Sequence, residues 1–114
     1  MSSRILIVDD NPDQIITLAE LLRMEGHKVE CATNALYALS MAREFHPEIV
    51  MIDLGLPYMD GYEALRKFKQ QCPGARMIAI TGRIGEENIA SSAGFEAYLT
   101  KPVDFEVIRR LITT

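Results

Sequence analysis

The sequence predicts an α/β domain with a five-stranded parallel sheet, in strand order 2-1-3-4-5, doubly wound by five helices. Short runs of apolar, often β-branched residues alternate along the chain with segments whose apolar residues recur at helical spacing. The connections between these segments are short, which is typical of a parallel sheet covered on both faces. We expect residues 1–114 to form one domain with a single core.

Five short apolar runs are the predicted strands. Arg4–Val8, Ile49–Asp53 and residues 77–80 are apolar on both faces, as buried strands of a parallel sheet are. Lys28–Ala32 alternates polar and apolar residues, which places it at an edge of the sheet. Ala97–Thr100 is the last strand. The order 2-1-3-4-5 satisfies this pattern, because it puts the second strand at an edge.

Capping residues delimit the predicted helices. The first begins after Asp10 or Asn11, has Pro12 at its first position and ends at Gly26. The others are predicted from Asn34 to just before Pro47, from Asp60 to about Gln71, over residues 86–93, and from Asp104 onward. Residues 86–93 begin with two acids, which favour the start of a helix. The residues predicted to face inward are Ile15, Leu18, Ala19, Leu22, Ala35, Ala38, Leu39, Ala42, Ala64, Leu65, Phe68, Phe105, Ile108, Leu111 and Ile112.

Composition and charge exclude several functions. The chain is 48% hydrophobic and 25% charged, as globular proteins are. A net charge of −4 gives no electrostatic footprint for nucleic acid, which would show as clustered lysine and arginine on a basic domain. No apolar run approaches the length of a membrane span and no signal peptide opens the chain, so we expect no membrane association and a cytoplasmic location. Cys31 and Cys72 fit no metal or redox spacing, and His27 and His46 are typical of loops rather than of metal sites.

Polar side chains gather where the predicted strands end. Asp9 and Asp10 follow the first strand, Asp53 ends the third, Thr81 follows the fourth and Lys101 follows the fifth. Each has an ordinary explanation by itself, such as a helix cap or a solvated lysine. Because the carboxyl ends of parallel strands meet in one crevice, we expect all five side chains to converge there.

Three carboxylates in one crevice repel one another unless a proton or a cation neutralises some of the charge. Oxygen ligands without histidine or cysteine favour a hard divalent ion, and Mg²⁺ suits a site that keeps several waters and shares a phosphate oxygen. A free carboxylate beside such an ion, with lysine and threonine donors, is what in-line phosphoryl transfer to a carboxylate requires. The strand ends therefore predict phosphoryl chemistry.

Five sequence blocks together resemble the receiver domain of two-component response regulators, which has a flavodoxin-like fold. They are Val8-Asp9-Asp10-Asn11-Pro12, Asp53-Leu54-Gly55-Leu56-Pro57, Met59-Asp60-Gly61-Tyr62, Thr81-Gly82, and the stretch from Ala93-Gly94-Phe95 to Tyr98-Leu99-Thr100-Lys101-Pro102. They occur in the family's order and span nearly the whole chain.

The resemblance implies that Asp53 accepts a phosphoryl group from a phosphohistidine. The donor would be a sensor histidine kinase or a histidine phosphotransfer domain. Asp53 would also bind Mg²⁺ (or Mn²⁺), together with Asp10 as a direct ligand, Asp9 as an outer ligand through water, and the backbone carbonyl of Gly55. We expect a domain that catalyses its own phosphorylation and dephosphorylation but is not a turnover enzyme.

The resemblance also implies a switch. Lys101 would pair with the phosphoryl group, Thr81 would hydrogen-bond to it, and Tyr98 would rotate into the space that Thr81 vacates. The Lys101-Pro102 bond is usually cis in the family and aims the lysine inward. The alternative for Tyr98 is a half-buried tyrosine of the last strand.

The fourth helix suits a switch because its sequence is weak. Gly82 and Gly85 precede it, and Ser91 and Ser92 occupy its interior, where serine competes for backbone hydrogen bonds. The signal would pass to an output or partner through the face of the fourth helix, fifth strand and fifth helix, which is also the expected face of a homodimer. A stand-alone regulator and part of a hybrid kinase or longer regulator both fit the chain.

Gly55 and Arg83 occupy the positions that tune the lifetime of the phosphoryl group in the family. We expect modest autodephosphorylation, which a decay measurement on the phosphorylated protein checks.

Three other functions fit the sequence less well. A binding module that works without phosphorylation would have lost an acid, Thr81 or Lys101. A small Mg²⁺-dependent phosphatase with an aspartyl intermediate needs a carboxylate where Gly55 stands. A flavin site would place Asp9 and Asp10 against the flavin phosphate.

Overall fold

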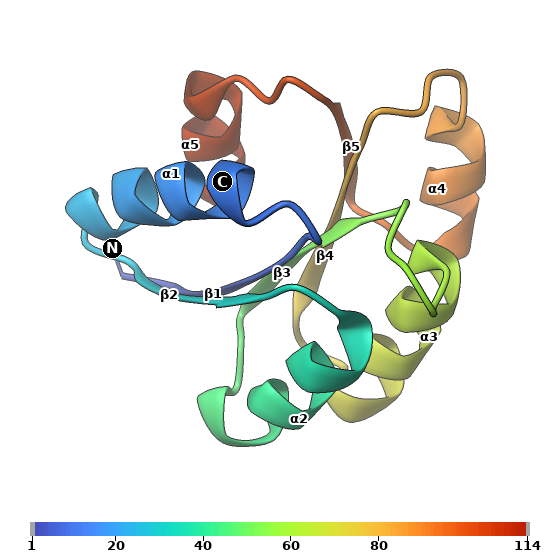
Figure 1. The fold of residues 1–114 in the computed structure, drawn as a ribbon, viewed down its shortest axis with the longest axis horizontal. Helices are drawn as coiled ribbons and strands as arrows, with labels where there is room; N and C mark the ends of the chain where they lie inside the picture. Colours follow the sequence, from blue (N-terminus) through green and yellow to red (C-terminus); the bar gives the residue numbers. More distant parts are fainter. Residues whose placement is uncertain (1, 114) are drawn as a thin grey trace.

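The structure is a computed structural model, and it describes residues 2–113. Five parallel strands form one sheet in the order β2-β1-β3-β4-β5 (Figure 1). The strands are Arg4–Val8 (β1), Lys28–Ala32 (β2), Ile49–Asp53 (β3), Arg76–Thr81 (β4) and Ala97–Thr100 (β5). The predicted fold class and strand order are confirmed. β4 begins one residue earlier than predicted and includes Thr81.

Helices cover both faces of the sheet. They are α1 (Pro12–Met24), α2 (Ala35–Phe45), α3 (Gly61–Gln71), α4 (Glu87–Ala93) and α5 (Phe105–Thr113). α1 and α5 lie on one face, and α2, α3 and α4 lie on the other (Figure 1). None of the helices within residues 2–113 has the length and apolar character needed to span a membrane.

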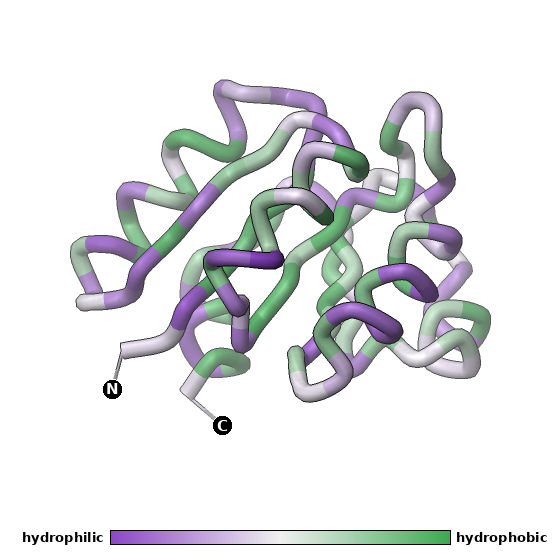
Figure 2. Tube along the Cα trace, turned by 90° about the horizontal axis from the view of Figure 1, so that it is seen from below, coloured by the Kyte–Doolittle hydropathy of each residue, from purple (hydrophilic) through white to green (hydrophobic). Residues whose placement is uncertain are grey.

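The sheet separates two apolar clusters. Along β1, Ile5 and Ile7 point to the cluster under α1 and α5, whereas Leu6 and Val8 point to the cluster under α2, α3 and α4. This alternation follows from the two-residue period of a strand. Hydrophobic residues line the central strands, while the helices mix hydrophobic and hydrophilic residues (Figure 2). The centre of the sheet is therefore buried against apolar side chains on both faces, so the polar residues at its carboxyl edge are held on a rigid part of the fold.

Four helices begin at the side-chain caps that the sequence indicates. In each of them, the side-chain Oδ1 atom of the cap residue accepts a hydrogen bond from a backbone N–H two or three residues later. The donor N–H groups are those of Asp13 for Asn11 (3.2 Å), Tyr37 for Asn34 (2.8 Å), Tyr62 for Asp60 (2.7 Å) and Glu106 for Asp104 (2.9 Å). Of the two residues predicted to cap the first helix, Asn11 is the cap. Asp10 is thereby left available for another role.

The start of α4 differs from the prediction. Glu86 stands at the N-cap rather than in the first turn, so Glu87 is the one acid in that turn. The Glu86 carboxylate accepts a hydrogen bond of 2.9 Å from the hydroxyl of Tyr62 and does not cap the helix. Burial, followed by this hydrogen bond, raises the pKa of Tyr62 to about 12. α4 is thus a short helix that a side-chain contact fastens to α3.

The first residue of α3 must be glycine, because the chain approaches itself closely there. A Cβ atom on Gly61 would lie 2.6 Å from the Cα atom of Leu54 and 2.7 Å from its side chain. The Gly61 N–H also points to the carbonyl of Leu54, at 3.4 Å. This approach seats α3 directly against the segment that follows Asp53.

Arg76 connects the last helix to the sheet. Its guanidinium donates to both carboxylate oxygens of Glu96 and to the carbonyl oxygens of Leu111, at 2.8 Å, and Ile112, at 3.3 Å. The hydrogen bond from Arg76 holds the pKa of Glu96 below its ordinary value of 4.5. A group whose pKa falls on folding stabilises the fold above its unfolded pKa, and this contribution is lost as the pH falls through the folded value.

We therefore expect Glu96→Gln to lower the free energy of unfolding at pH 7 by less than about 1 kcal/mol, because solvent screens this half-exposed pair. The deficit relative to the natural sequence should shrink as the pH falls below about 4.5. Urea unfolding at pH 7 and pH 3.5 measures it. Glu44→Gln, at an exposed position of α2, is the control. A deficit that stays constant over this pH range would contradict the assignment.

Candidate functional site

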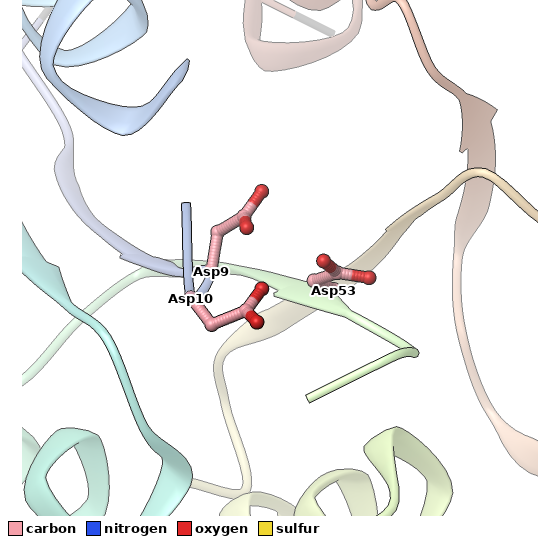
Figure 3. A group of neighbouring side chains, drawn as sticks. All are labelled: Asp9, Asp10 and Asp53. Carbon is pink, nitrogen blue, oxygen red and sulfur yellow. The ribbon is translucent and has the colours of Figure 1, made fainter. Parts of the chain in front are cut away.

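The acidic crevice lies where β1 and β3 end side by side. β1 pairs with β2 on one side and β3 on the other, so the order of the strands reverses there. One carboxylate oxygen from each of Asp9, Asp10 and Asp53 lies within 4.8 Å of the others, and the three side chains extend into the same space (Figure 3). Asp9 and Asp53 are buried, whereas Asp10 is exposed.

Lys101 bridges two of these acids. Its Nζ atom lies 2.9 Å from Oδ2 of Asp9 and 2.9 Å from Oδ2 of Asp53. Its backbone N–H donates to the carbonyl of Thr81 at 2.8 Å, which joins β5 to β4 at this edge. The Lys101–Pro102 peptide bond is cis, as the resemblance implies. The prediction did not foresee the contact with Asp9.

The remaining oxygens of the buried acids accept backbone hydrogen bonds. Oδ1 of Asp53 accepts from the N–H of Gly55 at 2.9 Å, and Oδ1 of Asp9 accepts from the N–H of Asn11 at 3.0 Å. Burial raises the pKa of Asp9 above its ordinary value, and the bond from Asn11 opposes this. For Lys101, burial lowers the pKa, but the hydrogen bonds to Asp53 and Asp9 outweigh it and the pKa is raised. Lys101 therefore stays charged between the two acids.

The donor set fits a hard divalent cation. Among residues 2–113, the Asp10 carboxylate has no hydrogen-bond or ion-pair partner. Three carboxylates against one ammonium leave excess negative charge, and every available donor is oxygen. Mg²⁺ prefers such ligands and keeps waters of its own, for which the exposed side of Asp10 leaves room.

Thr81 and Tyr98 are both bonded to the backbone of Arg83. The hydroxyl of Thr81, which is 1% exposed, accepts from the Arg83 N–H at 3.0 Å. The hydroxyl of Tyr98, on a half-buried side chain, donates to the Arg83 carbonyl at 2.8 Å. The Arg83 guanidinium forms an ion pair with Glu86 at 3.7 Å. One residue thus links β4, β5 and the start of α4.

The sequence did not indicate Tyr62 and Glu86 as parts of this region. The Tyr62 ring also packs edge-on against Phe95, with ring centroids 6.0 Å apart. Tyr62 and Glu86 are 24 residues apart, and neither belongs to a polar strand end. A tyrosine in the first turn of α3 and an acid before α4 were visible in the sequence, but their pairing depends on how the two helices pack.

A doubly wound parallel sheet in the order β2-β1-β3-β4-β5 defines the flavodoxin-like class of α/β domains, and in this chain the switch point of the sheet carries an acidic crevice. A family model for the response regulator receiver domain matches residues 5–113. The chain is 36% identical over 104 residues to the chemotaxis protein CheY of Halobacterium salinarum, which covers 90% of this chain and 87% of that protein.

Two solved structures extend the comparison. The crystal structure of a CheY-like response regulator receiver domain protein from Methanospirillum hungatei has a TM-score of 0.91 and 33% identity, covering 99% of this chain and 92% of that one. The receiver domain of a sensor histidine kinase from Pseudomonas aeruginosa, with a magnesium ion coordinated in its active site cleft, has a TM-score of 0.85 and 28% identity, covering 99% and 96%.

This chain belongs to the response regulator receiver domains. They are signalling domains of two-component systems rather than turnover enzymes, and they bind Mg²⁺ at an acidic pocket. The resemblance carried by the five sequence blocks is therefore confirmed.

Proposed function

We propose that residues 1–114 form a receiver domain in which Asp53 accepts a phosphoryl group from a phosphohistidine of a sensor histidine kinase or histidine phosphotransfer protein. The observation that carries the proposal is the position of Asp53. It is the last residue of β3, and its carboxylate contacts Lys101 and lies close to the carboxylates of Asp9 and Asp10. A pocket of about 380 Å³ opens beside Asp9 and Lys101, between α1 and the β5–α5 connection.

The transfer is a single displacement at phosphorus. An oxygen of Asp53 forms the new P–O bond as the bond from phosphorus to the donor imidazole nitrogen breaks. The imidazole nitrogen keeps the electron pair of the broken bond, and the phosphoryl group stays at its oxidation level. Lys101, held at 2.9 Å from Asp53, offsets charge on the phosphoryl oxygens. The Gly55 N–H, bonded to the other oxygen, fixes the rotation of the carboxylate.

Mg²⁺ or Mn²⁺ would be held by Asp10, Asp53 and the carbonyl of Gly55 directly and by Asp9 through water. The different environments of Asp9 and Asp10 support this assignment. Asp10 is exposed and has no partner within residues 2–113, whereas Asp9 contacts Lys101 and accepts a hydrogen bond from Asn11. When bound, the ion neutralises charge on the phosphoryl oxygens.

The proposed switch begins at Thr81. Its hydroxyl would exchange the Arg83 N–H for a phosphoryl oxygen, and Tyr98 would leave the Arg83 carbonyl and turn inward. α4 has seven residues and no side-chain cap, so it is the element that this change moves most easily. The face of α4, β5 and α5 would then bind an output partner or a second copy of the domain.

Gly55 and Arg83 would set the phosphoryl lifetime. Gly55 is exposed, and a Cβ atom there would lie 3.5 Å from Oδ1 of Asp53, an ordinary contact. A larger side chain at this position would therefore reach the Asp53 carboxylate without pushing it out of place. Arg83 is turned toward Glu86, which leaves water access to Asp53 less restricted than an inward arginine would. We propose no binding of nucleic acid or membranes by this domain.

Incubation with Mg²⁺ and acetyl phosphate tests the proposal. We expect a mass gain of one phosphoryl group on the natural sequence and none on Asp53→Asn, which removes the nucleophilic oxygen but keeps the size of the side chain. Asp60→Asn, at the N-cap of α3, is the matched control and should be labelled normally. An unlabelled natural protein, or label that persists in Asp53→Asn, contradicts the proposal.

A further inference from the structure

Tyr58 is the most exposed large apolar side chain among residues 2–113. Its exposed fraction is 98%, and it lies in the connection between β3 and α3, residues 54–60, which starts immediately after Asp53. Within the described residues its side chain makes no hydrogen bond or aromatic contact. Neither the fold nor the acidic crevice accounts for an aromatic ring in water at this position.

The backbone at Tyr58 is strained. Its φ is +68°, in the left-handed region that tyrosine rarely adopts. The N–H of Met59 donates to the carbonyl of Pro57 at 2.8 Å, so Tyr58 is the central residue of a γ-turn. A γ-turn with positive φ is the rare, strained form, and glycine or asparagine would fit it better. Strain without a compensating contact points to a role outside the folding of this chain.

The turn holds the ring in a fixed place. Leu54, Leu56 and Met59 are buried and anchor both sides of the turn in the core under α3. Pro57 restricts the backbone just before Tyr58. The ring is thus presented to solvent by a rigid support, which reduces the entropy that ordering it on binding would cost.

We propose that Tyr58 is a docking residue for the protein that donates the phosphoryl group; this rests on the proposed function of Asp53. Asp53 is 6% exposed, so a donor histidine reaches it only from the carboxyl edge of the sheet. The connection that carries Tyr58 leaves from that edge, and a protein large enough to bear the histidine covers it. Tyrosine is enriched among residues that dominate protein interfaces. A small donor reaches Asp53 without touching the ring.

The test compares two donors that both contain a P–N bond. One is the autophosphorylated histidine kinase that labels this chain fastest in a screen of the kinases of its host. The other is phosphoramidate, which offers no protein surface. Tyr58→Asn keeps the positive φ and removes the ring, and Tyr58→Phe keeps the ring. Met24→Ala removes an 81% exposed side chain at the end of α1, at the opposite edge of the sheet, and is the control.

We expect Tyr58→Asn to slow transfer from the kinase by about tenfold, as loss of an interface tyrosine does. Its rate with phosphoramidate should stay within about twofold of the natural sequence. Tyr58→Phe should keep most of the kinase rate, and Met24→Ala all of it. An unchanged kinase rate in Tyr58→Asn overturns the proposal, and so does an equal loss with both donors, which would show that Tyr58 shapes the site itself. Failure of both donors to label the natural protein would instead contradict the role of Asp53.

Discussion

Lys101→Met is expected to slow phosphoryl transfer from acetyl phosphate to Asp53 by about 10²–10³-fold, the usual cost of losing one group that stabilises charge in the transition state. Lys101 is the charge-stabilising side chain that directly contacts Asp53, at 2.9 Å, and it is held there by Asp9 on its other side. Methionine preserves the length and apolar stem of lysine but removes the charge. The rate of mass gain at saturating Mg²⁺ measures the effect.

Lys67→Met is the matched control for this experiment. Lys67 is an exposed lysine of α3, so the same substitution there removes a positive charge outside the crevice. We expect an unchanged labelling rate. If Lys101→Met were labelled as fast as the natural sequence, the ammonium would have no part in the transfer, and its contact with Asp53 would be structural only.

Removal of Mg²⁺ should lower the stability of the natural protein, and Asp10→Asn should abolish this dependence. At a free concentration tenfold above its Kd, a ligand of the folded state adds about 1.4 kcal/mol to the free energy of unfolding. This corresponds to several degrees in Tm for a domain of this size. A Mg²⁺ titration followed by thermal unfolding, with reversal by EDTA, measures it without relying on phosphorylation.

Asp10→Asn isolates the metal because Asp10 is exposed and has no partner within residues 2–113. Its Tm in EDTA should therefore equal or exceed that of the natural sequence, since one of three neighbouring carboxylates loses its charge. Glu20→Gln, at an exposed position of α1, should keep the full response to Mg²⁺. A response that survives in Asp10→Asn would remove Asp10 from the metal site.

The convergence of the strand-end residues was predictable because it depends on topology alone. Once β1 and β3 are recognised as neighbouring parallel strands, Asp9 and Asp53 have to meet, whatever their side-chain conformations. The caps at Asn34 and Asp60 were equally accessible, since each contacts an N–H two or three residues away. Local rules and strand order together were sufficient for these features.

Contacts that depend on packing were not predictable. Lys101 could have faced Asp53 alone, and its position between Asp9 and Asp53 follows from the distance between two strand ends. Glu86 looked like a helix-start acid, but the Tyr62 hydroxyl competes for its carboxylate. Tyr58 sits where the backbone takes a positive φ, and nothing in a single sequence reveals that a tyrosine adopts it.

The two hydrogen bonds at Arg83 bear on the energetics of the proposed switch. The same residue offers its N–H to Thr81 and its carbonyl to Tyr98, so both side chains are released by breaking two neutral hydrogen bonds. Each contributes about 0.5–1.5 kcal/mol net. A gap of this size leaves the alternative conformation populated at a low but finite level before any phosphoryl group arrives. Phosphorylation would then redistribute two conformations that already coexist, and the basal signal of the unmodified domain would depend on how firmly Arg83 holds its two neighbours.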